Sequence, residues 1–104
     1  MDLKTIEEAM HAFVSSKGWY EPDSKRPQTP RNLAISLALE ASEVLELYQW
    51  SEAEPNKEEL SGELADVMLY LIQLSSLSGI DLGEAVMNKL KINYGRTWDE
   101  NRNE

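Results

Sequence analysis

Four carboxylates in the middle of the sequence stand in two pairs, Glu40 with Glu43 and Glu63 with Asp66, and the members of each pair are three residues apart. Residues at this spacing share one face of an α-helix, because each residue advances about 100° around the axis. If the chain turns back near residues 53 and 54, the two pairs lie at the same height, roughly 15–20 Å from the turn. Mg²⁺ and Mn²⁺ prefer such oxygen ligands. The spacing therefore predicts a divalent metal site between two antiparallel helices.

Two of these acids, Glu40 and Glu63, fall on the helix faces that carry apolar residues. A buried ionised carboxylate is costly unless it is paired or bound to metal. Residues 40–66 contain nine acids and a single base, Lys57, so local counter-charge is scarce. Alternatively, a chain with 28% charged residues forms such pairs by chance on solvated faces. The matched height and angle of the two pairs favour metal binding over chance.

Three polar residues near the end of the sequence, Lys89, Asn93 and Arg96, recur at a spacing of four and then three residues. On a helix this spacing places them within about 60° of one another. Two cations and an amide on one face could hold phosphate oxygens. They are equally typical of a solvated face whose cations favour the negative end of the helix dipole.

A proline-rich stretch, residues 19–30, precedes the first acidic pair and predicts a loop of about twelve residues, a length at which loops are often functional. Lys25, Arg26 and Arg31 lie in it or just after it and could also reach a phosphate. Trp50 falls on the same side of its predicted helix as Glu43. It could stack on a nucleobase or serve as a buried hydrophobic anchor.

The remaining sequence predicts the helices that position these residues. Apolar residues recur at helical spacing, with Gly18 and Gly79 as stop signals. We expect helices over residues 2–17 and 30–50, a third from about residue 57 to Gly79, and a fourth from about residue 82 to Tyr94. No alternating segment indicates a strand. The predicted fold is all-α, with four to five helices around a central antiparallel helix hairpin.

The whole chain of 104 residues has the size of a single domain, residues 1–104. Its net charge of −9 argues against binding a nucleic-acid polymer or an anionic membrane surface. Neither a long apolar run nor a signal-peptide pattern is found, so we expect a soluble cytoplasmic protein. The apolar run MLYLIQL, residues 68–74, covers nearly all sides of the third helix. It predicts self-association as a dimer or tetramer.

The two acidic motifs, within LALEASEVLELYQW and ELADVMLYLI, resemble those of the MazG-like nucleotide pyrophosphohydrolases. The run PRNLAISLALEASEVLELYQW is most similar to the dCTP pyrophosphatase branch of that superfamily, and the similarity covers roughly residues 5–96. It implies an all-α fold that assembles into helical bundles. It also implies Mg²⁺-dependent cleavage of a nucleoside triphosphate between the α- and β-phosphates, which releases monophosphate and pyrophosphate.

The resemblance also assigns residues. By position, the metal ligands would be Glu40, Glu43, Glu63 and Asp66, whereas the substrate would meet Trp50, Lys89 and Asn93. Three features depart from the branch, and one of them is the proline loop, residues 19–30, which is longer than expected. The chain reads INYGRTW where a basic residue and Tyr-Pro are usual, with Arg96 as a replacement cation, and Gln28 stands where a histidine is common.

In the mechanism that we expect, the bound metal lowers the pKa of a water molecule, and this water attacks phosphorus. Glu43 would orient this water, with Glu46 as the alternative base, and Lys89 and Arg96 would stabilise the leaving pyrophosphate. The expected substrates are pyrimidine deoxynucleoside triphosphates resembling dCTP, in a housecleaning role. The alternatives are a non-catalytic nucleotide-binding or dimerisation module, and a related hydrolase for dUTP or phosphoribosyl-ATP.

Overall fold

The computed structural model describes residues 1–97, and the last seven positions of the predicted domain lie outside them. Within this range the chain forms helices and no strand, which confirms the all-α prediction. The four helices follow one another in the order α1 (Leu3–Ser16), α2 (Pro30–Glu46), α3 (Lys57–Leu77) and α4 (Leu82–Tyr94).

Each helix begins at a side chain that caps its first turn. Thr29 accepts a hydrogen bond from the backbone N–H of Asn32, and Pro30 occupies the first helical position. Asn56 and Asp81 cap α3 and α4 in the same way. These local interactions explain why the starts of the helices could be predicted from the sequence.

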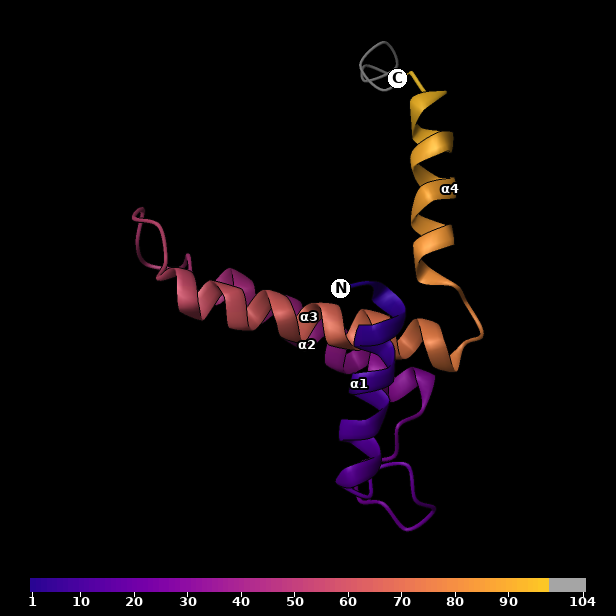
Figure 1. Ribbon diagram of the computed structural model, residues 1–104. Coiled ribbons are helices and arrows are strands. Elements are labelled where there is room, and N and C mark those ends of the chain that lie inside the picture. The colour runs from indigo at the N-terminus through magenta and orange to yellow at the C-terminus, as the bar shows by residue number, and fades with distance from the viewer. Residues whose placement is uncertain (98–104) are drawn as a thin grey trace.

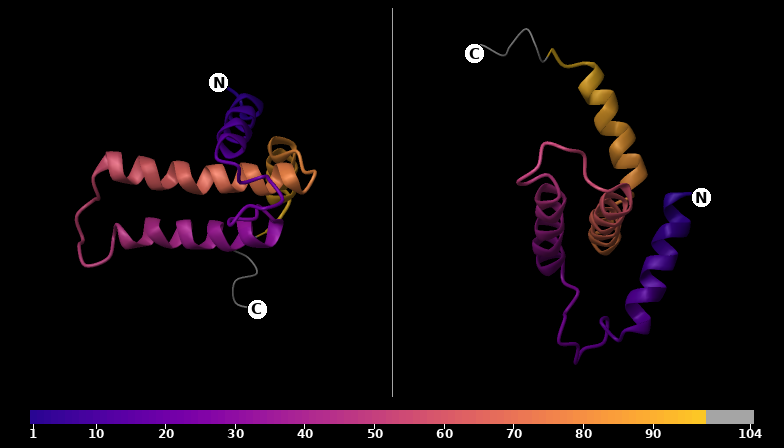
Figure 2. Two further views of the ribbon diagram at one scale, coloured as in Figure 1. Left: turned by 90° about the horizontal axis from the view of Figure 1, so that it is seen from below. Right: turned by 90° about the vertical axis from the view of Figure 1, so that its left-hand side faces the viewer.

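The central element is the antiparallel hairpin formed by α2 and α3, which lie side by side along most of their length (Figure 2). Helix α1 crosses α3 near the C-terminal end of α3 (Figure 1). At this crossing Met10, Val14 and Ile72 form the buried core. The core thus lies at one end of the hairpin and leaves the middle of α2 and α3 to hold polar groups.

The end of α2 differs from the prediction. The expected helix over residues 30–50 ends at Glu46, and residues 47–50 form turns. Trp50 has a φ of 71°, in the left-handed region that side chains other than glycine rarely adopt. The prediction was too long because apolar residues continue at helical spacing through Leu47 and Tyr48, with no glycine or proline to mark the end.

Helix α4 leaves the end of α3 and extends away from the hairpin (Figure 1). None of its residues is buried, and Val86, Met87, Leu90 and Ile92 are between 46% and 66% exposed. The radius of gyration, 17.0 Å, exceeds the roughly 13 Å expected of a compact chain of this length. As a result, α4 presents an apolar surface that no part of residues 1–97 covers.

Candidate metal and nucleotide site

Three carboxylates meet between the two helices of the hairpin. Glu40 and Glu43 come from α2 and Glu63 from α3, and each offers an oxygen that lies within 4.8 Å of the others. Glu40 and Glu63 are partly buried, whereas Glu43 is exposed. The hairpin therefore brings together three of the four acids predicted as ligands, and Asp66 lies outside this group of three.

The surroundings of the three carboxylates, named here the acidic triad, raise the pKa of Glu40 and of Glu63. Burial raises the pKa of Glu40 to about 6, and a hydrogen bond to Glu43 and the charges of Glu43, Asp66 and Glu63 add to the rise. The pKa of Glu63 is also raised, chiefly by a hydrogen bond to Glu43, then by burial and by neighbouring charges. One oxygen each of Glu40 and Glu63, Oε2, is buried without a hydrogen-bond partner. This set of oxygens fits a divalent cation, which would supply the missing counter-charge.

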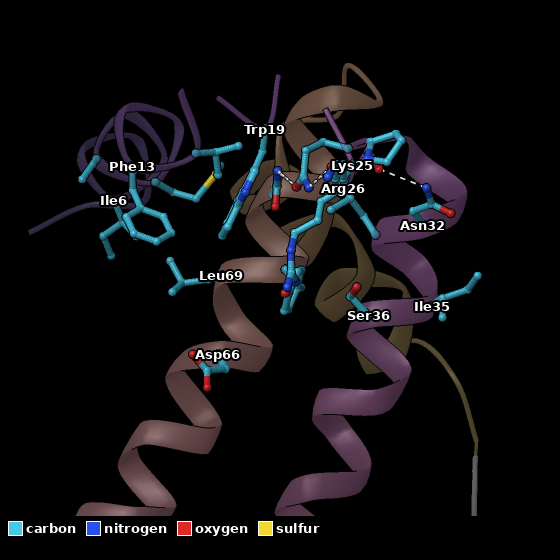
Figure 3. A pocket seen from close by; sticks show the side chains of 18 of the residues that line it. Ile6, Phe13, Trp19, Lys25, Arg26, Asn32, Ile35, Ser36, Asp66 and Leu69 are labelled. Carbon is cyan, nitrogen blue, oxygen red and sulfur yellow. Dashed lines mark hydrogen bonds between the residues drawn. The ribbon is translucent and has the colours of Figure 1, made fainter. Parts of the chain in front are cut away.

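A cavity of about 890 Å³ adjoins the acidic part of the hairpin. Asp66 lies on its wall, at the opposite end from the loop residues Lys25 and Arg26 (Figure 3). Apolar and aromatic side chains form most of the lining. The lining residues are Met1, Thr5, Ile6, Ala9, Met10, Phe13, Val14, Trp19, Lys25, Arg26, Pro27, Gln28, Asn32, Leu33, Ile35, Ser36, Asp66, Leu69, Tyr70 and Gln73.

A partly buried network of polar side chains ties α1, α3 and the proline loop together, and two of its members, Gln28 and Gln73, line the cavity. His11 bridges the hydroxyls of Tyr20, at 2.5 Å from Nδ1, and Ser76, at 2.7 Å from Nε2. The Gln73 amide donates to Tyr20 at 3.3 Å and to Gln28 Oε1 at 2.8 Å. Sequence reasoning missed this network, since Gln73 stands inside an apolar run and its partners are far away along the chain.

Comparison with known proteins identifies the family. The model of the MazG-like family matches residues 35–104, which include both acidic motifs. The chain belongs to the MazG-like family. Its resemblance to the dCTP pyrophosphatase branch is also supported: it is 38% identical to "dCTP pyrophosphatase 1" of Rattus norvegicus and 36% identical to that of Homo sapiens. Each alignment spans 90% of this chain and 58% of the relative, so the chain spans less than two thirds of these relatives' length.

A solved structure supports the same assignment. A pyrophosphatase from Archaeoglobus fulgidus superposes with a TM-score of 0.74 at 32% sequence identity, and the match covers 86% of both chains. Over a shorter stretch of 38 residues, the chain is 47% identical to a "dATP/dGTP diphosphohydrolase" of Salmonella phage PMBT28. This match covers 36% of this chain and 13% of the phage protein.

Two further predicted residues lie near the end of α2 in this MazG-like chain. Glu46 is exposed in the last turn, and its charge helps to raise the pKa of Glu63, so it stands close to the acidic triad. Trp50 is 93% exposed in the turns after α2 and does not line the cavity.

The predicted phosphate-binding residues are spread over other elements. Arg31 is exposed in the first turn of α2. Lys89 and Asn93 lie on α4 and Arg96 just after it, on the helix that points away from the hairpin (Figure 1). Within the chain as described, Lys89, Asn93 and Arg96 are therefore not brought to the acidic triad. Asn93 Oδ1 is buried without a hydrogen-bond partner in the described part of the chain.

No helix within residues 1–97 is long and apolar enough to cross a membrane.

Proposed function

We propose that this protein, acting as one domain over residues 1–104, is a Mg²⁺-dependent pyrophosphohydrolase of nucleoside triphosphates. Its substrates are pyrimidine deoxynucleoside triphosphates, dCTP first among them, and its products are the monophosphate and pyrophosphate. The observation that carries the proposal is the acidic triad with its two buried, unpartnered oxygens. The names of the relatives, dCTP pyrophosphatase and pyrophosphatase, support the reaction.

Glu40, Glu43 and Glu63 would hold the metal, with Asp66 beside them. A bound Mg²⁺ neutralises triphosphate charge and lowers the pKa of water, and Mn²⁺ has the same preference for oxygen ligands. The exposed carboxylate of Glu43 orients the attacking water, and Glu46 is the alternative base. Because Glu43 belongs to the triad and Glu46 stands close to it, either could take the proton that water loses as it attacks phosphorus.

The nucleotide lies along the cavity, with its triphosphate towards the triad and its base at the loop end. The cavity wall supports this orientation, because Asp66 lies at one end and Trp19 and Arg26 lie at the other (Figure 3). Trp19 offers an aromatic surface against which a base can pack.

A second copy of the chain completes the site. The exposed apolar face of α4 calls for a covering surface, and a dimer or tetramer provides one. In such an assembly α4 of one protomer lies beside the triad of another. Its polar residues, Lys89 and Asn93, and Arg96 just after it then stabilise the leaving pyrophosphate. Trp50 and Arg31, both exposed in one protomer, contact substrate in the same assembly. The enzyme works on nucleotide pools in the cytoplasm as a housecleaning activity.

The test is pyrophosphate release from a panel of nucleotides, with Mg²⁺ and with chelator, by the wild type and by Glu63→Gln. We expect Mg²⁺-dependent release that Glu63→Gln abolishes while its circular dichroism spectrum stays unchanged. Retained activity in Glu63→Gln contradicts the metal assignment. Binding of nucleotide without any turnover favours a non-catalytic module, and preference for dUTP or phosphoribosyl-ATP redefines the substrate.

A further inference from the structure

Arg26 occupies a defined position at the loop end of the cavity. Its guanidinium carbon lies 5.8 Å from the centre of the Trp19 ring, and Trp19 itself packs edge-on against Phe13 at 5.7 Å. A guanidinium over an aromatic ring keeps its N–H donors available in its own plane. A flat ligand that packs on the Trp19 ring beside Arg26 therefore presents its edge to the N–H donors of the guanidinium.

The backbone at Arg26 is held by Ser24 and by Gln28, and Gln28 in turn contacts the buried Gln73. The Gln28 amide donates to the Arg26 carbonyl at 2.7 Å and accepts from the Gln73 amide at 2.8 Å. Gln73 is only 3% exposed, and the Arg26 N–H donates to Ser24 Oγ at 3.0 Å. These contacts anchor Arg26 to α3, so its side chain starts from a fixed point in an otherwise exposed loop.

The two charged side chains at the loop end of the cavity, Lys25 and Arg26, are hydrogen-bond donors. Both polar atoms of the Gln28 amide are used within the loop and α3. The Asn32 amide donates to the Pro27 carbonyl at 3.0 Å. The acidic residue among the cavity lining is Asp66, which lies at the opposite end (Figure 3). Lys25 and Arg26 thus make this end selective for a ligand edge that carries hydrogen-bond acceptors.

Among the pyrimidines, cytosine alone offers two adjacent acceptors, O2 and N3, because N3 of uracil and thymine carries a hydrogen. A guanidinium fork matches two adjacent acceptors and is repelled by an N–H at that place. We propose that Arg26 is a specificity residue that donates to O2 and N3 of cytosine and so selects dCTP over dUTP and dTTP. This inference rests on the proposed function, because it takes the ligand to be a pyrimidine nucleotide.

Loss of one bidentate contact to a base weakens discrimination by about ten- to a hundredfold. Arg26→Ala therefore reduces the preference for cytosine by that factor, and Arg26→Lys, which keeps the charge but not the fork, recovers little of it. Gln28→Met, which keeps the length of the side chain but releases the Arg26 carbonyl, has a smaller effect in the same direction. Lys17 provides a matched control: it lies 5.8 Å from the Phe13 ring centre and outside the cavity lining.

The experiment measures dissociation constants for α,β-imido analogues of dCTP, dUTP and dGTP in Mg²⁺, beside turnover of the natural nucleotides. Because these analogues resist cleavage at the α–β position, binding is measured whether or not the protein is an enzyme. We expect wild type and Lys17→Ala to bind the cytosine analogue at least tenfold more tightly than the uracil analogue, and Arg26→Ala to lose this preference. The 3-deaza analogue of cytosine, which lacks the N3 acceptor, should bind the wild type as weakly as uracil does.

Four results would overturn the inference, and the first three are equal weakening of cytosine and uracil binding in Arg26→Ala, a wild type that prefers uracil, and full affinity for the 3-deaza ring. Tighter binding of guanine than of cytosine also overturns it, since guanine presents adjacent acceptors at O6 and N7. Cytosine-selective binding that depends on Arg26, without any turnover, contradicts the proposed function and supports the inference.

Discussion

Glu40→Gln should stabilise the metal-free protein and destroy its response to metal. In the folded chain the pKa of Glu40 is raised from 4.5 to about 6, first by burial and then by Glu43 and the neighbouring acids. A rise of this size corresponds to about 2 kcal/mol at full strength. Solvent reaches the partly buried carboxylate, so screening reduces the cost of its ionisation to about 1 kcal/mol.

The sign follows from the direction of the pKa change. Below about pH 4.5, Glu40 is protonated in both the folded and the unfolded chain, and its ionisation costs the fold nothing. The cost develops as the pH rises from about 4.5 through about 6 and is complete at pH 8. Glutamine carries no charge, so the variant avoids this cost. At pH 8 in chelator it should melt about 4–8 °C above wild type, and well below pH 4.5 the difference should vanish.

Added Mg²⁺ should reverse the order of the two proteins. A ligand present at a hundred times its dissociation constant stabilises the fold by about 2.7 kcal/mol, and the wild type should gain on this scale. The variant has lost one oxygen donor of the acidic triad and should gain far less. Thermal melting at pH 8 in chelator and in Mg²⁺, with exposed Glu8→Gln on α1 as control, measures both effects.

Two results would refute this reasoning. One is a lower melting temperature for Glu40→Gln in chelator at pH 8, which would mean that the ionised carboxylate stabilises the fold. The other is an equal gain from Mg²⁺ in both proteins, which would remove Glu40 from the metal site. Glu8→Gln should follow wild type in both conditions.

Other variants test the remaining parts of the structure. His11→Ala removes one hydrogen bond each from the Tyr20 and Ser76 hydroxyls, of which Tyr20 keeps its contact with Gln73, and should lower the free energy of unfolding by about 2 kcal/mol in urea titrations; a loss below about 0.5 kcal/mol would show that the network is not formed. Trp50→Gly relieves the left-handed backbone and should raise that free energy by up to about 1 kcal/mol, while KM for dCTP rises if Trp50 contacts substrate. Mixing inactive Glu63→Gln with inactive Lys89→Ala should restore about a quarter of wild-type turnover if α4 serves a partner's triad in a dimer. If the mixture stays inactive, Glu63 and Lys89 act in the same site of one chain, and the shared site is contradicted.

Local and periodic signals account for what the sequence could predict. The starts of α2, α3 and α4 depend on capping residues such as Thr29 and Asn56, which act within three or four positions. The meeting of Glu40, Glu43 and Glu63 follows from helix geometry and the length of the hairpin. The end of α2 was missed because it depends on the turn at Trp50, which has no glycine or proline signal.

Features that depend on the path of the chain in space could not be predicted. The contact between Gln28 and Gln73 joins residues 45 positions apart, and neither position carries a periodic pattern that identifies its partner. The cavity was missed for the same reason, because α1 and the proline loop close it over α2 and α3. The direction of α4 depends on the short turn between Leu77 and Leu82, which carries no periodic pattern, so the spacing of Lys89, Asn93 and Arg96 could indicate a shared face but not its location.

Phosphorus NMR of dCTP hydrolysis in Mg²⁺ and in chelator tests the central claim most directly, because it reports both the metal requirement and the bond that is cleaved. The acidic triad and the proposed reaction predict equal amounts of dCMP and pyrophosphate in Mg²⁺, and unchanged dCTP in chelator. Release of dCDP and orthophosphate, or hydrolysis that persists in chelator, would contradict it.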